Sequence, residues 1–209
     1  MAVNQAPKRT TVALLWSDMA IHYYVSARSA HFWNHHPNAE LQAHHAIEMQ
    51  LKWALARPLP PEWKRVRPDL AGRSQQRTVK ELWDRRHFLS KLWEMVDTDY
   101  PNHTLQRFRD YVLFLDRIEP MRYQRFPDGE AVGYTSSMEA AQNVTGGETH
   151  SIDLPKFDEL FRGLLDLVET DANWVKGVVD PGWMQRSTAP QGSSQDYYRR
   201  DNAHALWPA

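Results

Sequence analysis

The 209-residue sequence contains no cysteine, which excludes disulfides, thiolate zinc sites and a cysteine nucleophile. No stretch approaches 18 consecutive apolar residues, so we expect no membrane-spanning helix. The first ten residues lack a basic region followed by an apolar run, so we expect no signal peptide and a cytoplasmic protein. Lys and Arg number 25 against 26 Asp and Glu, so no global excess of charge indicates a nucleic-acid partner.

Two common catalytic signatures are also missing. The sequence has no glycine-rich phosphate loop, because Gly146-Gly147 lacks the strand and helix that should flank such a loop. It has no Gly-x-Ser-x-Gly nucleophile elbow either. Function must therefore be sought in helical patterns rather than in these two motifs.

Apolar residues recur at helical spacing in five segments. They predict an all-α, up-and-down bundle of about five helices, which we assign to residues 11–170. We expect the third helix to break near His87, and Asn38 to cap the second. Turn signals around short β-prone pieces predict a small β-hairpin insertion before the last core helix, and the final residues, 171–209, read as an irregular tail. The expected helices are 11–33, 41–56, 78–96, 101–119 and 154–168, with the hairpin within 120–153.

The helix expected over 41–56 is apolar on nearly every side, which is typical of a helix in the middle of a bundle. Its only polar stripe consists of His45, Glu48 and Lys52, with His44 beside it. Polar groups on such a helix must be paired, solvated at a cleft or functional. The stripe is therefore the first place to look for a site.

Two interpretations of this stripe are open. Glu48 precedes Lys52 by four residues, the favourable order for an intrahelical ion pair, so the stripe can be a salt bridge plus a histidine bonded to a neighbouring helix. Alternatively, it lines a polar, ligand-binding cleft against the first helix near Tyr24 and Arg28. The second interpretation makes all five residues candidate ligand contacts.

A cluster of histidines offers a third possibility, a metal site. His31 and His35 share one helical face, as do His44 and Glu48, and an antiparallel turn at Pro37 could bring the two sets together. Three histidines and a glutamate would suit zinc or a non-haem metal. The chain lacks the paired acidic motifs of di-iron bundles, however, so we expect no resident metal or other cofactor. The cluster's remaining members are His36 and His45.

Basic residues also gather in three short runs, at 64–67, 73–77 and 85–86, near Trp63 and Trp83. Such a patch could contact phosphates. It could equally be the solvated face of a loop, offset by acidic residues elsewhere.

The order of these pieces resembles that of HEPN-like proteins, all-α bundles whose name refers to nucleotide binding in higher eukaryotes and prokaryotes. The resemblance covers roughly residues 12–170, and it implies the same helical fold. The matching pieces are Tyr23-Tyr24-Val25-Ser26-Ala27-Arg28, then His45-Ala46-Ile47-Glu48-Met49-Gln50-Leu51-Lys52, then His87-Phe88-Leu89 with Leu92-Trp93, then Arg122-Tyr123 with Pro127-Asp128-Gly129, and finally Asp153-Leu154-Pro155.

Catalytic HEPN-like proteins are metal-independent ribonucleases, marked by Arg, four to six residues and then His near the start of the last core helix. Here Arg162 in that helix has no following His. The spacing does occur at Arg28 and His35, in the wrong helix, and at Arg199 and His204, which would fit only if the tail forms a docked helix. The resemblance thus implies a non-catalytic binding module for a nucleotide, RNA or a protein partner. The alternative is a toxin-type, metal-independent endoribonuclease that uses Arg199 and His204, with its site built across a homodimer.

Overall fold

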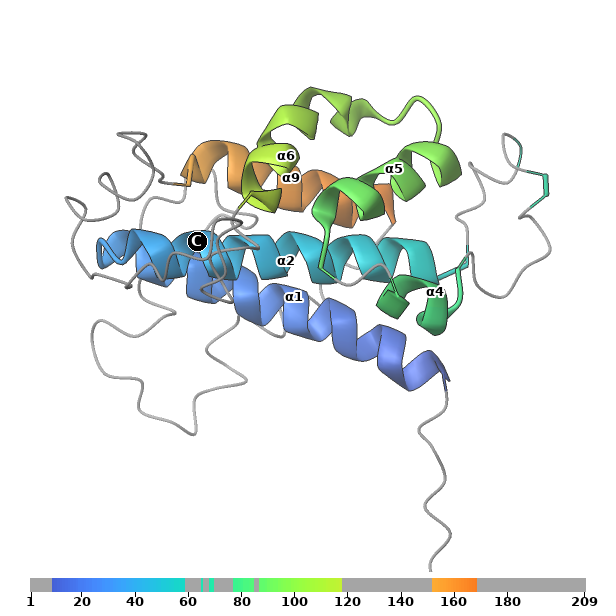
Figure 1. The fold of residues 1–209 in the computed structure, drawn as a ribbon, viewed down its shortest axis with the longest axis horizontal. Helices are drawn as coiled ribbons and strands as arrows, with labels where there is room; N and C mark the ends of the chain where they lie inside the picture. The colour runs from blue at the N-terminus through green and yellow to red at the C-terminus, as the bar shows by residue number, and fades with distance from the viewer. Residues whose placement is uncertain are drawn as a thin grey trace, which may run out of the picture.

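The computed structural model describes residues 9–58, 65, 68–69, 77–84, 87–117 and 152–168, with side chains from residue 16 onward. These residues form six α-helices and one 3-10 helix, and none of them lies in a strand, which confirms the all-α class for this part of the chain (Figure 1). The expected hairpin within 120–153 and the tail at 171–209 lie essentially outside the described residues. The elements are α1 (Arg9–Phe32), α2 (His36–Ala56), α4 (Val79–Asp84), α5 (Leu89–Asp99), η1 (Thr104–Phe108), α6 (Arg109–Asp116) and α9 (Leu154–Leu167).

The first two helices form an antiparallel hairpin joined by a tight turn. Asn34 adopts a left-handed conformation with φ of 58°, which ends α1 in the manner of a C-terminal cap. Pro37 occupies the first turn of α2, where a missing N–H costs nothing. The helix consequently starts before Asn38, and the prediction that Asn38 is its cap was wrong. The N-cap is His35, and the side chain of Asn38 accepts a hydrogen bond from Gln42 instead.

Helix α2 lies at the centre of the described fold. It packs against α1, α4, α5, α6 and α9, as its all-round apolar pattern predicted (Figure 1). The helix ends at Ala56, and the backbone N–H of the following Arg57 closes the last turn on the carbonyl of Trp53. The polar stripe of α2 is thus surrounded by other helices rather than exposed along its length.

The third and fourth expected helices are each divided in two. The break near His87 is confirmed, because α4 ends at Asp84 and α5 begins only at Leu89. The segment expected as one helix from residue 101 contains η1 and then α6, and it starts at Thr104 because Asn102 takes a left-handed conformation with φ of 64°. These breaks let short helices turn across α2 and carry polar side chains toward it.

Helix α9 is closed at its N-terminus by Asp153, whose carboxylate accepts a hydrogen bond from the backbone N–H of Lys156. Its apolar face joins α1 and α2 in a core that also takes in α5, η1 and α6. Each large apolar side chain removed from water there contributes about 1.5–3 kcal/mol. The bulkiest fully buried apolar members are Trp93, Tyr24, Tyr100, Phe157 and Phe161.

Candidate functional site

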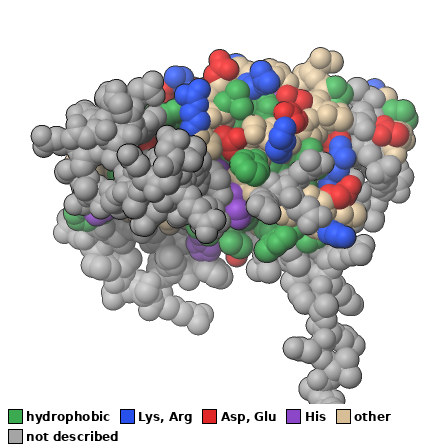
Figure 2. Space-filling view, viewed as in Figure 1, with side chains coloured by type: hydrophobic (Ala, Val, Ile, Leu, Met, Phe, Trp, Pro, Cys, Tyr) green, Lys and Arg blue, Asp and Glu red, His purple; other side chains and the backbone are tan. Residues whose placement is uncertain are grey.

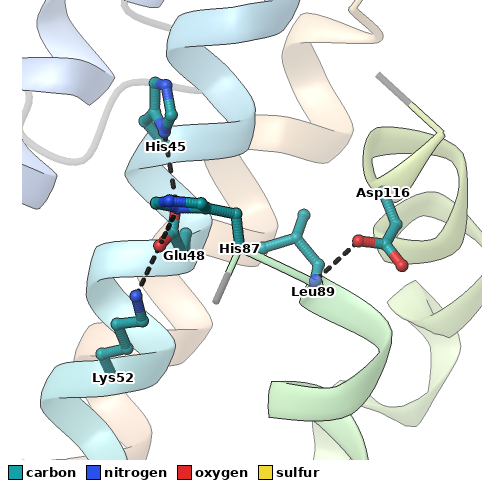
Figure 3. Close-up of polar contacts among 6 residues, drawn as sticks. All are labelled: His45, Glu48, Lys52, His87, Leu89 and Asp116. Carbon is teal, nitrogen blue, oxygen red and sulfur yellow. Dashed lines mark hydrogen bonds and ion pairs between the residues drawn. The ribbon is translucent and has the colours of Figure 1, made fainter. Parts of the chain in front are cut away.

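Three side chains that can carry positive charge converge on one buried carboxylate, that of Glu48 in α2 (Figure 3). Lys52 donates to Oε1 over 2.6 Å, and His87 approaches the same oxygen with Nδ1 at 2.8 Å. His45 places its Nδ1 3.3 Å from Oε2. An ionised carboxylate only accepts hydrogen bonds, so each histidine must carry a proton on Nδ1 to make its bond. We call these four residues the Glu48 cluster.

His87 reaches this cluster because the start of α5 is fixed from outside. Phe88, the N-cap residue of α5, offers no side-chain hydrogen bond to the first turn. Asp116, at the end of α6, supplies it by accepting from the backbone N–H of Leu89 at 2.6 Å (Figure 3). It also accepts from the backbone N–H of Ser90 at 3.2 Å. A carboxylate at a helix N-terminus also faces the positive end of the helix dipole. Asp116 thereby anchors the segment that carries His87.

The electrostatics of the cluster keep Glu48 ionised. Burial alone would raise the pKa of Glu48, but its hydrogen bond with His45 and the nearby Lys52 ammonium outweigh burial and lower the pKa to about 2. A carboxylate with such a pKa remains charged near neutral pH and is a poor proton acceptor. In the described structure Glu48 therefore serves as an anionic centre for the cations around it.

His44 lies beside the cluster and is fully buried. Burial lowers its pKa to about 4, against the opposing influence of the Glu48 charge, so the imidazole is neutral at pH 7. Ring nitrogens of His44 and His45 and a carboxylate oxygen of Glu48 all lie within 4.8 Å of one another. These three residues are the described side chains best placed to hold a metal ion.

Tyr24 and Arg28 engage a different carboxylate. Tyr24 donates to Asp158 of α9 over 2.6 Å, and Arg28 forms an ion pair with the other oxygen of Asp158. Arg28 and Asp158 are almost completely buried, and the Tyr24 ring stacks on Phe161 at 4.4 Å between centroids. The predicted cleft residues thus divide into two groups, with His45, Glu48 and Lys52 brought together while Tyr24 and Arg28 bind α9.

The Glu48 cluster reaches the surface beside exposed aromatic side chains. The side chain of His87 is 32% exposed, and its neighbour Phe88 is also exposed. Trp83 of α4 is 66% exposed, and its ring lies 5.9 Å from the ammonium of Lys52. On the face shown in Figure 2, basic and acidic side chains of the described residues are interspersed rather than separated. The distinctive feature beside the Glu48 cluster is the pair of exposed aromatic side chains, Trp83 and Phe88.

The remaining predicted candidates fall elsewhere. His31 and His36 meet at the turn between α1 and α2, with ring centroids 5.7 Å apart. Eight residues of helix, about 12 Å, separate His36 from His44, so the turn does not merge the two histidine sets as the metal hypothesis required. Arg199 and His204 lie outside the described residues, as do most of the basic runs. In the 73–77 run, Arg77 is described, and it forms two hydrogen bonds to Asp99.

Sequence reasoning missed two buried carboxylates. Asp158 lies on the apolar face of α9, four residues after Leu154 and three before Phe161, and a charge in such a place signals a buried partner. Glu40 lies on the apolar face of α2 between Ala39 and Ala43, and its Oε1 has no hydrogen-bond partner. Burial raises the pKa of Glu40 to about 7. The sequence predicted His87 as a helix break and as part of the HEPN-like pattern, but not its pairing with Glu48, which lies 39 positions away.

Comparison with known proteins identifies no relative. No protein family matches the chain, and no curated protein sequence or solved structure is significantly similar to it. The resemblance to HEPN-like proteins therefore stays a prediction. No helix in the described ranges has both the length and the apolarity required to cross a bilayer.

Proposed function

We propose that this protein is a non-catalytic, HEPN-like binding module whose ligand is a nucleotide or single-stranded RNA. The observation that carries the proposal is the exposed Trp83, set against the Lys52 ammonium and near the partly exposed His87. Every nucleobase has a π-face, so a solvent-facing aromatic ring suits base stacking. Lys52 is buried and paired with Glu48, so it supports the Trp83 ring from within rather than contacting a phosphate itself. Phe88 adds a second exposed ring near the same segment.

The non-catalytic part of the proposal rests on the state of the charged side chains. Acid–base catalysis needs an accessible group whose pKa is near the working pH. Glu48 is buried with a pKa of about 2, so it cannot exchange a proton with a ligand at the surface. Arg28 is buried against Asp158, so it cannot bind the phosphate of such a ligand. These groups instead stabilise the helices that present the aromatic surface.

Binding of a fluorescently labelled, mixed-sequence 12-nucleotide RNA, followed by anisotropy in the presence of EDTA, tests the proposal. Trp83→Ala should weaken binding about 5- to 150-fold, because one stacked base contributes roughly 1–3 kcal/mol. Trp33→Ala is the matched control, since Trp33 is another highly exposed tryptophan at the far end of α1 and should leave affinity unchanged. Equal affinity of wild type and Trp83→Ala would refute the proposed surface.

The same RNA distinguishes the endoribonuclease alternative. Cleavage in EDTA by wild type but not by His204→Ala would establish a metal-independent nuclease in place of a binding module. Intact RNA with both proteins, together with Trp83-dependent binding, is the result we expect. Light scattering of the same samples tests the homodimer that the resemblance implies.

A further inference from the structure

We infer that His44, His45 and Glu48 form a binding site for a first-row transition-metal ion, Zn²⁺ above all. Their donor atoms lie within 4.8 Å of one another, and all three residues are buried in the middle of α2. Helical geometry explains the convergence, because Glu48 follows His45 by three residues and His44 by four, which places the side chains on one face. The site adjoins the RNA-binding surface proposed above, because Glu48 also binds Lys52 and His87, but its other two ligands, His44 and His45, take no part in that surface.

The distance between His45 and Glu48 fits a bridging ion. Their Nδ1 and Oε2 atoms are 3.3 Å apart, longer than the usual N–H···O separation of about 2.9–3.0 Å. In a tetrahedral zinc site with bonds of about 2.0–2.1 Å, neighbouring ligand atoms are roughly 3.3–3.4 Å apart. A zinc ion would thus replace the proton shared by these two atoms with little movement of either. His44 would complete the set, since one of its ring nitrogens lies within 4.8 Å of the ligand atoms of His45 and Glu48.

The other oxygen of Glu48 is already held in place. Lys52 and His87 both engage Oε1, so Oε2 can bind a metal while Oε1 keeps its partners (Figure 3). Such outer contacts orient a ligating carboxylate and strengthen its hold on the ion.

The donor set and its access define the class of ion and of site. Two imidazoles and one carboxylate favour zinc, copper or nickel over magnesium or calcium, which prefer oxygen ligands. Two histidines and a glutamate leave the fourth position of a tetrahedral ion unfilled by the described ligands, as in sites that bind water or a small ligand. The partly exposed His87 marks the side from which solvent could reach that position.

Titration of untagged, chelator-stripped protein with Zn²⁺, in competition with a chromophoric chelator, tests the site. We expect one ion per chain, at least tenfold weaker binding by His45→Gln, and unchanged binding by the control His22→Gln, whose histidine is exposed on α1. Loss of Glu48 charge could unfold the chain, so the histidine substitution is the better first variant.

Cobalt supplies a readout that needs no variant. Co²⁺ added to wild-type protein should give the intense visible absorption of a four- or five-coordinate ion, and one equivalent of Zn²⁺ should abolish it. Either of two results would overturn the inference: a spectrum of octahedral, solvent-like cobalt, or stoichiometric zinc binding that His45→Gln retains at full affinity.

Discussion

Replacing Glu40 by Gln should stabilise the protein at neutral pH and have little charge-related effect in mild acid. Glu40 is 1% exposed, and its Oε1 accepts no hydrogen bond. Burial raises its pKa from 4.5 to about 7, so the unfolded chain releases this proton far more readily than the folded protein. Ionisation in the unfolded state therefore draws the equilibrium toward unfolding as pH rises through 4.5 toward 7.

The size of the effect follows from that shift. Each pKa unit corresponds to 1.36 kcal/mol, so the raised pKa of Glu40 costs about 3 kcal/mol of folding stability at pH 7. At pH 4.5 the same cost falls to about 0.4 kcal/mol, because half of the unfolded chains still hold the proton. The amide of Gln does not titrate in this range. Relative to wild type, the variant should thus gain roughly 2.5 kcal/mol on going from pH 4.5 to pH 7.

Urea unfolding, followed by circular dichroism at both pH values, measures this difference directly. Any packing or hydrogen-bond change introduced by the amide is independent of pH and cancels in the comparison. Glu94→Gln, the same substitution at an exposed glutamate on α5, serves as the control. A gain for Glu40→Gln that is the same at pH 4.5 and pH 7 would refute the reasoning.

Two further predictions concern the buried charges. Asp158→Asn should destabilise the fold by about 3–5 kcal/mol in urea unfolding, because it leaves the buried Arg28 without its carboxylate. The control is Asp166→Asn on the same helix, which replaces an exposed carboxylate and should change stability little. A loss of less than about 1 kcal/mol for Asp158→Asn would contradict a stabilising role of the ion pair. Protonation of His44 should lower the folding stability of wild type in EDTA by roughly 3 kcal/mol as pH falls from 6.5 to 4. The reason is that the pKa of His44 is about 4 in the folded protein and 6.5 in the unfolded chain, so the unfolded chain takes up the proton first. His44→Gln should flatten that slope and His22→Gln should not, while the contribution of Glu48 is complete above pH 4.5 and disappears only toward pH 2.

Local sequence patterns predicted the parts of this fold that depend on nearby residues. The all-round apolar character of α2 indicated its central place, and the four-residue spacing of Glu48 and Lys52 predicted their ion pair. The placement of Asn38 failed because Pro37 favours the first turn of a helix, so α2 begins earlier than a side-chain cap would suggest.

The site was predictable only in part, because its other contacts join distant segments. Nothing near His87 in the sequence indicates that its partner is Glu48, and nothing near Arg28 indicates Asp158, since side-chain pairing between helices depends on how the whole chain packs. What the sequence does contain is the mismatch of a charged residue on an apolar face, as at Asp158 and Glu40. Such a mismatch predicts that a partner or a shifted pKa exists, but it does not say which.

The ion pair between Arg28 and Asp158 has a consequence for protein synthesis. The two residues are 130 positions apart, so at 5–20 residues per second a ribosome adds Asp158 on the order of ten seconds after Arg28. During that interval the hairpin of α1 and α2 cannot bury Arg28 against its carboxylate, nor cover the apolar surface that α9 later occupies. The nascent chain should accordingly bind chaperones until α9 emerges, and chains that terminate before α9 should be degraded rather than accumulate.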